Sequence, residues 1–160
     1  MNVEDGKHVF HPYHGVGILT GTNVEKKILG RIKKFFEVRF NRKQFNMMFS
    51  DFKSSMMSRI NSRSELNSML SRLKNYDVKI EVYPKNSLKR FDLFLDLLKT
   101  GNLFKVAECF KAIKSIQENV RLSKQEKNLM EVLENSMCDI IVCLKGVTFS
   151  EAHDHLGAFI

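Results

Sequence analysis

The sequence predicts an α+β protein in which a small N-terminal β-barrel is followed by a compact all-α domain. Up to about residue 60, apolar and polar residues alternate as they do in strands, and after residue 61 apolar residues recur at helical intervals. Five or so short strands within about sixty residues favour a small barrel over an open sheet. We therefore predict a barrel over residues 1–61, a helical domain over residues 62–145, and a loosely attached tail over residues 146–160, where no strong period is found.

The N-terminal stretch is rich in histidine and glycine. Val9 and Phe10 lead into Pro12, which fixes its own φ and holds the preceding residue in an extended conformation. Gly15 and Gly17 then alternate with apolar residues. Glycines at this spacing mark a bend, a bulge or a close approach by another backbone. The stretch predicts a short strand, a kinked turn and a second strand, which suits a strongly curved barrel.

Two further strands are predicted as a hairpin. Residues 34–40 and 44–49 alternate apolar with polar residues, and residues 41–43 have the composition of a turn. The apolar positions that share a face are Phe36, Val38 and Phe40 in the first strand, and Phe45, Met47 and Phe49 in the second.

Capping signals and apolar spacing predict four helices. Ser62 with Glu65, and Ser123 with Glu126, have the spacing of a capping box that opens a helix. The predicted helices cover about residues 62–73, 88–99, 103–117 and 123–144. The stripe expected to face the core in the second helix is Leu88, Phe91, Leu95 and Leu98.

Positive charge is concentrated in the first half of the chain. The net charge is +8, and residues 1–80 hold 15 Lys and Arg against 7 Asp and Glu, whereas residues 81–160 hold 11 of each. Within the second half, residues 81–127 are basic and the remainder is acidic. A basic front with an acidic end suits a protein that meets a polyanion or an acidic partner on one side. A solvated basic surface without a partner is the alternative.

The histidines and cysteines do not form a metal-binding pattern. A zinc site needs three or four converging ligands, and no Cys or carboxylate cluster accompanies the N-terminal histidines His8, His11 and His14. Cys138 and Cys143 are five residues apart and so lie on different faces of a predicted helix. The sequence contains no phosphate-binding glycine loop, nucleophile elbow or zincin motif. We expect no metal, no cofactor, no small-molecule substrate and no enzymatic activity.

Cysteine usage and hydropathy indicate the compartment. An odd number of cysteines, all in the helical half, is interpreted as reduced thiols in a cytoplasmic protein. The longest purely apolar run, residues 140–144, is far shorter than the ~20 residues that a membrane span needs. Because Glu4 and Asp5 stand where a signal peptide would be apolar, we expect no export and no membrane partner.

Basic residues of the helical half gather near two helix starts and their connecting turns. Free backbone N–H groups at helix starts, together with Lys and Arg, form a natural surface for phosphate. Solvated helix faces are the alternative. The residues concerned are Lys85, Lys89, Arg90, Lys105, Lys111 and Lys127.

Three stretches of the sequence resemble the CarD/CdnL-type bacterial transcription regulators. Residues 9–17 (VFHPYHGVG) resemble the opening of that family, and are similar also to the polymerase-binding module of the transcription-repair coupling factor. Residues 98–108 (LKTGNLFKVAE) resemble the family's helix-glycine-helix passage, and residues 122–127 (LSKQEK) resemble the start of its next helix. The order and spacing agree over about residues 7–144.

The resemblance implies a Tudor-like N-terminal barrel that binds the β subunit of RNA polymerase. It also implies a helical domain that contacts promoter DNA at the upstream edge of the melted bubble and stabilises the open complex without chemistry. The polymerase-binding strand of the family aligns with Lys26, Lys27 and Ile28, where the usual triplet is altered. Arg59 aligns with the arginine that closes the family's barrel.

On the DNA side the chain departs from the family pattern. The family commonly carries a Trp wedge before a basic pair, whereas this chain has no Trp and carries Ser87 at the matching position. A serine cannot prop open a base step as an aromatic or apolar wedge does. Lys89, Arg90 and Lys127 match basic positions that face phosphate. We expect weak, sequence-tolerant and salt-sensitive binding of double-stranded DNA. A stand-alone, nucleoid-type DNA-binding protein and a module for another protein partner are the alternatives.

Overall fold

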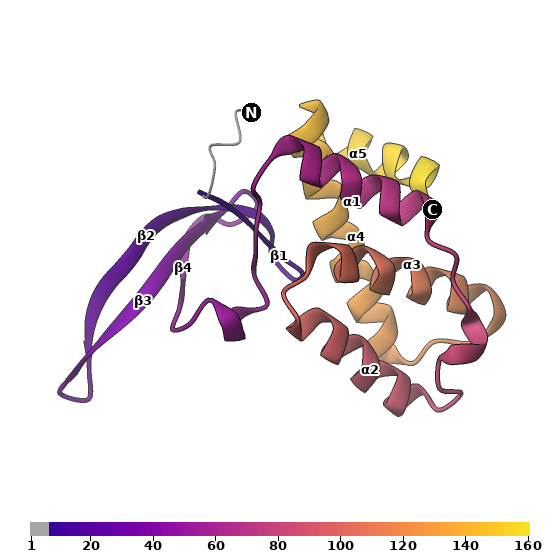
Figure 1. Cartoon of the computed structure of the whole chain (residues 1–160), viewed down its shortest axis with the longest axis horizontal. Coiled ribbons are helices and arrows are strands. Elements are labelled where there is room, and N and C mark those ends of the chain that lie inside the picture. The colour runs from indigo at the N-terminus through magenta and orange to yellow at the C-terminus, as the bar shows by residue number, and fades with distance from the viewer. Residues whose placement is uncertain (1–6) are drawn as a thin grey trace.

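The computed structural model describes residues 7–160, so the first six residues of the predicted N-terminal domain lie outside it. A five-stranded antiparallel sheet is followed by five α-helices (Figure 1), which confirms the α+β class. The strands are β1 (His8–His11), β2 (Gly15–Ile28), β3 (Arg31–Phe40), β4 (Asn46–Phe49) and β5 (Ser58–Arg59). The helices are α1 (Arg63–Asn75), α2 (Ser87–Lys99), α3 (Leu103–Asn119), α4 (Lys124–Lys145) and α5 (Phe149–Leu156). Short 3-10 turns are η1 (Lys53–Ser55), η2 (Ile80–Val82) and η3 (Gly157–Phe159).

The strands pair in the order β4-β3-β2-β1-β5. The predicted hairpin is confirmed, because Phe36 lies opposite Phe49 and Val38 lies opposite Met47 across β3 and β4. The prediction that Phe45 shares their face is wrong, since Phe45 precedes β4 and is 66% exposed. Within residues 7–160, β4 and β5 remain the two edges of the sheet, so its Tudor-like closure into a barrel stays a prediction.

A two-stranded arm projects from the sheet (Figure 1), and we define it as residues 24–35. It forms because β2 and β3 are longer than their neighbours. β1 pairs only with residues 15–18 of β2, and β4 pairs only with residues 36–39 of β3. Register shifts between Leu19 and Val24 bend β2 before the arm begins. The arm therefore stands clear of the hydrophobic core.

The four predicted helices are present as α1 to α4, and both predicted capping signals mark helix starts. Ser123 and Glu126 form a capping box at α4, and the Ser62 side chain accepts a hydrogen bond from the Glu65 N–H at α1. The predicted stripe of α2 is only partly right. Leu98 is buried, Phe91 and Leu95 are half-buried, and Leu88, in the first turn, is 61% exposed. Phe94, which was not predicted, is buried instead.

The prediction of a loosely attached tail over residues 146–160 is wrong, because this segment folds into a helix that packs on the core. Thr148 and Glu151 form a capping box that opens α5, and Ala152 and Leu156 are buried in the main core. A helix of eight residues has only two turns, so its apolar period is too short to recognise in the sequence.

One hydrophobic core joins the sheet to the helices. It contains Phe10, Val16 and Ile60 together with apolar residues of all five helices. A smaller cluster, Val9, Val38, Phe40 and Met57, lies within the β-domain. The turn between β1 and β2 is bound directly to α4, where the Ser136 hydroxyl donates a hydrogen bond of 2.6 Å to the Pro12 carbonyl. The two predicted domains are therefore packed as one body.

Among residues 7–160 there is no helix long and apolar enough to cross a membrane.

Candidate functional site

The arm carries the three residues predicted to contact polymerase. Lys26, Lys27 and Ile28 are the last residues of β2, and all three are exposed. The register places them opposite β3 residues Lys33, Ile32 and Arg31, respectively. The predicted triplet thus lies at the solvent-exposed end of the arm, where a partner can reach it.

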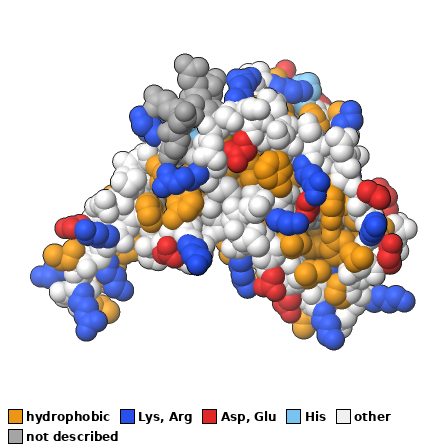
Figure 2. Space-filling model, viewed as in Figure 1, with side chains coloured by type: hydrophobic (Ala, Val, Ile, Leu, Met, Phe, Trp, Pro, Cys, Tyr) orange, Lys and Arg blue, Asp and Glu red, His pale blue; other side chains and the backbone are white. Residues whose placement is uncertain are grey.

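The arm has a strong excess of positive charge. It contains five Lys and Arg against one carboxylate, Glu25, which forms an exposed ion pair of 3.9 Å with Lys34. Lys26 and Lys33 lie directly opposite each other on one face, an unfavourable pairing of like charges. Figure 2 shows basic side chains gathered at this end of the molecule, with apolar side chains among them. An anionic partner would relieve the repulsion between the two lysines.

Apolar residues at the tip of the arm were missed by sequence reasoning. Leu29 is 98% exposed, and Ile28 and Ile32 are exposed beside it. The signal that could have identified them is the Leu-Gly pair between two strand-like runs, which marks the tip of a hairpin. The arm therefore offers an apolar tip surrounded by cations.

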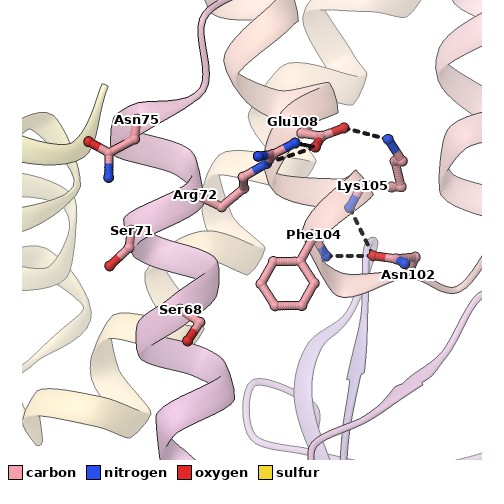
Figure 3. Close-up of a pocket in the computed structure, with 8 residues that line it drawn as sticks. All are labelled: Ser68, Ser71, Arg72, Asn75, Asn102, Phe104, Lys105 and Glu108. Carbon is pink, nitrogen blue, oxygen red and sulfur yellow. Dashed lines mark hydrogen bonds and ion pairs between the residues drawn. The ribbon is translucent and has the colours of Figure 1, made fainter.

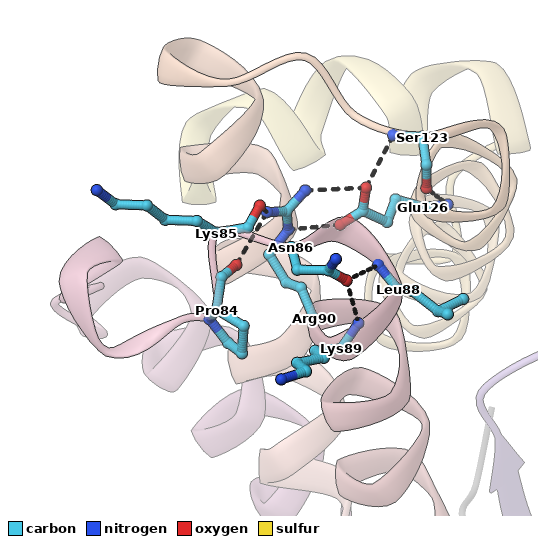
Figure 4. A network of polar contacts seen from close by, with 8 residues as sticks. All are labelled: Pro84, Lys85, Asn86, Leu88, Lys89, Arg90, Ser123 and Glu126. Atoms are coloured by element: carbon cyan, nitrogen blue, oxygen red, sulfur yellow. Dashed lines mark hydrogen bonds and ion pairs between the residues drawn. The ribbon is translucent and has the colours of Figure 1, made fainter.

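A second cationic site lies at the start of α2 (Figure 4). Asn86 caps the helix by accepting hydrogen bonds from the N–H groups of Leu88 and Lys89. The side chains of Lys85 and Lys89 are exposed there, and Ser87 is the half-buried first residue of the helix. Lys127 is exposed in the first turn of α4. We call this set the α2-start site: Lys85, Ser87, Leu88, Lys89 and Lys127.

Arg90 was predicted to face phosphate, but the structure contradicts this. The residue is 2% exposed, and its Nε and Nη2 donate to the two carboxylate oxygens of Glu126 at 2.5 and 3.1 Å. Nη1 donates to the carbonyl groups of Pro84 and Lys85 (Figure 4). Because the guanidinium is enclosed and bonded on all sides, Arg90 is a structural residue.

The Arg90–Glu126 pair brings the starts of α2 and α4 together. Burial opposes ionisation of Glu126, but hydrogen bonds from Arg90 and Ser123 outweigh it and lower the pKa of the carboxyl. Glu126 thus serves both the capping box of α4 and the ion pair. The pair therefore brings the first turn of α4, which contains Lys127, close to the start of α2.

Lys105 and Lys111, also predicted to bind DNA, lie apart from the α2-start site. They belong to α3, whose first residue follows the end of α2, so Lys105 lies about 20 Å from the start of α2. Lys105 donates a hydrogen bond of 2.8 Å to Glu108, and Lys111 donates one of 2.7 Å to the Lys74 carbonyl. Both amines thus satisfy acceptors of the protein itself.

Lys105 borders an open pocket of about 570 Å³ between α1 and α3 (Figure 3). Arg72 and Lys105 both donate to the Glu108 carboxylate there. Burial raises the pKa of Glu108, yet these two hydrogen bonds outweigh burial and lower it. The charges of Arg72 and Lys105 in this pocket are therefore partly neutralised by Glu108, whereas the arm has an excess of positive charge.

Two of the N-terminal histidines, His11 and His14, belong to an aromatic cluster with Phe40. His11 is buried, and its ring stacks on His14 with a centroid distance of 4.4 Å. Burial, and then the neighbouring His14, lower the pKa of His11 to about 3. In the part of the chain that the structure describes, no group of three or more His, Cys or carboxylate side chains could hold a metal ion. The cysteines Cys109, Cys138 and Cys143 are buried free thiols.

Comparison with known proteins identifies the helical domain. A family model described as the CarD C-terminal domain matches residues 68–157, a range that includes the α2-start site and α5. No curated protein matches the chain. The matched residues make up more than half of the 160. On this evidence the chain belongs to the CarD family of transcription factors.

Proposed function

We propose that this protein regulates transcription by binding the β subunit of RNA polymerase through the arm and promoter DNA through the α2-start site. It acts by stabilising the open complex, performs no chemistry and works at the nucleoid in the cytoplasm. The observation that carries the proposal is the presence of two exposed cationic sites, one in each half of a single packed body. Membership of the CarD family supports a role in transcription.

The polymerase contact is assigned to Lys26, Lys27 and Ile28. Their exposure and the excess charge of the arm support this assignment, because an acidic partner surface would neutralise the opposed lysines. The exposed apolar side chain of Ile28, next to the two lysines, would be removed from water in the complex.

The DNA contact is assigned to Lys85, Lys89 and Lys127, with Ser87 between them. Leu88 extends this surface, because an exposed apolar side chain at a helix start can pack against a sugar or a base step. Arg90 is left out because its guanidinium is enclosed and bonded within the protein. Lys105 and Lys111 are left out because they belong to α3 and each ammonium already donates to an acceptor of the protein. Binding through so few cations is expected to be weak and strongly dependent on salt.

The polymerase contact is tested by copurification of the tagged full-length protein with RNA polymerase from native lysate. Lys26→Glu and Ile28→Ala should each reduce the polymerase recovered. Lys74→Glu is the matched control, because Lys74 is an exposed lysine at the end of α1, outside the arm. If both arm variants recover as much polymerase as the wild type, the arm is not the contact surface.

The DNA contact is tested by fluorescence anisotropy with a labelled duplex at several salt concentrations. Lys89→Ala and Lys127→Ala should each reduce the slope of log K against log salt by about one. Lys74→Ala should leave the slope unchanged. An affinity that does not change between low and moderate salt would refute an electrostatic contact. DNA binding without polymerase recovery would favour the stand-alone DNA-binding alternative.

The effect on initiation is tested by measuring the lifetime of open complexes on a promoter with purified polymerase. The wild-type protein should lengthen the lifetime, and Lys26→Glu and Lys89→Ala should each shorten it toward the value without the protein. An unchanged lifetime with the wild type would contradict the proposed role in the open complex.

A further inference from the structure

The tip of the arm has an unusual backbone for its sequence. Leu29 and Gly30 form the two-residue turn between β2 and β3, with φ of +48° and +78°. Positive φ at both positions is the pattern of a type I′ turn, for which Asn-Gly is strongly preferred. Leucine has no polar side chain that helps it adopt this conformation, so Leu29 is strained where Asn would not be.

Leu29 is also fully exposed. Its side chain is 98% accessible to solvent, and the tip also exposes Ile28 and Ile32. The residue therefore combines backbone strain with an unburied apolar side chain, and within residues 7–160 it gains no core packing in return. Strain that the fold does not use is characteristic of sites that bind something else.

The surroundings of Leu29 indicate the kind of partner. Lys26 and Lys33 face each other two pairs below Ile28 and Arg31, on the same face of the arm. Lys27 lies opposite Ile32 in the pair between, on the other face. An apolar centre with a charged rim is the usual composition of a protein–protein contact. A contact to nucleic acid needs the cations but has less use for two neighbouring exposed apolar side chains, Ile28 and Leu29.

We propose that Leu29 is the anchor of the arm, inserted into an apolar pocket rimmed by carboxylates on the protein partner. This inference rests on the proposed function, because the partner is taken to be RNA polymerase. It adds a residue outside the Lys26–Lys27–Ile28 triplet and defines the partner's surface by its chemistry. The opposed Lys26 and Lys33 contact the carboxylates, which explains why two like charges are kept in register.

The test is Leu29→Asn in the full-length protein. Because Asn suits a left-handed turn followed by Gly, the variant should unfold at a melting temperature about 2–4 °C higher than the wild type. Because the apolar anchor is removed, its affinity for purified RNA polymerase, measured by isothermal titration calorimetry, should fall about tenfold or more. A gain in stability with a loss of binding is not expected of a residue that only maintains the fold.

Phe45→Asn is the matched control, since Phe45 is an exposed apolar residue in another turn of the same domain. It should leave the affinity for polymerase unchanged. Lys33→Ala should weaken binding more at low salt than at high salt, because its contribution is electrostatic.

Three results would overturn the inference. A Leu29→Asn variant that binds polymerase as the wild type does would show that the tip is not an anchor. A variant that loses affinity for duplex DNA and keeps affinity for polymerase would make the arm a nucleic-acid element. If the wild type itself gives no binding heat with polymerase, the proposed function fails, and this inference fails with it.

Discussion

The carboxylate of Asp139 on α4 lies 2.7 Å from Nε of Arg42, which belongs to the turn between β3 and β4. Asp139 is buried and also accepts a hydrogen bond from the Val16 backbone. The Arg42 guanidinium in turn lies over the ring of Phe149 in α5, 5.5 Å from its centroid. One carboxylate therefore fastens the β3–β4 turn and the start of β2 to the helical domain, and so holds the arm in a defined position relative to the α2-start site.

Asp139→Ala should lower the free energy of unfolding by about 2–3 kcal/mol. Breaking a buried ion pair costs about 3–5 kcal/mol, but the Arg42 side chain is one-third exposed and can regain part of its hydration. The measurement is equilibrium unfolding in guanidinium chloride. Asp154→Ala, at an exposed position of α5, should change the free energy of unfolding by less than about 0.5 kcal/mol. Equal values for the two variants would show that Asp139 does not hold the domains together.

Gly15→Ala should be more destabilising than Gly146→Ala, although both glycines have positive φ. A Cβ at Gly15 would lie 1.7 Å from an Asp139 carboxylate oxygen, whereas a Cβ at Gly146 would meet nothing within 4 Å. Gly146→Ala therefore reports left-handed strain alone, about 1–2 kcal/mol. In an Asp139→Ala background the cost of Gly15→Ala should fall to about the same value. An unchanged cost in that background would place the clash elsewhere.

Arg90→Ala should destabilise the protein by about 3–5 kcal/mol, because it leaves the Glu126 charge buried without its partner. Lys89→Ala, one residue away, should change stability by less than about 0.5 kcal/mol. DNA titrations at several salt concentrations should show the opposite order, with the slope reduced in Lys89→Ala and retained in folded Arg90→Ala. A reduced slope in the Arg90 variant would restore Arg90 to the DNA surface.

Stability should fall by about 2 kcal/mol between pH 7 and pH 5. The pKa of His11 is about 3 in the folded protein and about 6.5 in the unfolded chain, so below pH 6.5 the unfolded state binds the proton first. The pKa of His14 is lowered in the same direction, first of all by burial. Stability is thus complete above pH 6.5 and is lost as the pH falls toward 3.

Equilibrium unfolding at the two pH values checks this prediction. His11→Asn, whose side-chain oxygen can still accept the Tyr13 N–H, should flatten the pH dependence, whereas the exposed His153→Asn should not. Glu108 and Glu126, whose pKa values are lowered, lose their contribution only below about pH 4.5. Asp139 acts in the opposite sense, because burial raises its pKa and its folded form takes up a proton as the pH falls.

Leu156→Ala should lower the free energy of unfolding by about 2–4 kcal/mol, because Leu156 is buried in the main core. Asp154→Ala serves as the control here too. Chemical denaturation of both variants would distinguish an integral α5 from a detachable one. A loss below about 0.5 kcal/mol for Leu156→Ala would mean that α5 adds little to the core.

Local signals predicted the order of the elements well. The serine caps at residues 62 and 123 mark helix starts because they act on N–H groups two or three residues away, within reach of sequence inspection. The β3–β4 hairpin was predictable for the same reason, since its turn and alternation are local. α5 was missed because two turns of helix leave too few apolar positions to show a period.

The sequence by itself determined where the cations stand along the chain and that an excess of them lies in the arm. Only the tertiary structure decided which of them remain available. Lys89 and Arg90 are neighbours in the sequence, yet one is exposed and the other is enclosed against Glu126, 36 residues further on. The reason is physical: a guanidinium is buried only where a carboxylate and carbonyl oxygens of other parts of the chain accept its hydrogen bonds. The position of these acceptors depends on how the helices pack. The same packing left Leu29 in water, since no other element of residues 7–160 reaches the end of the arm.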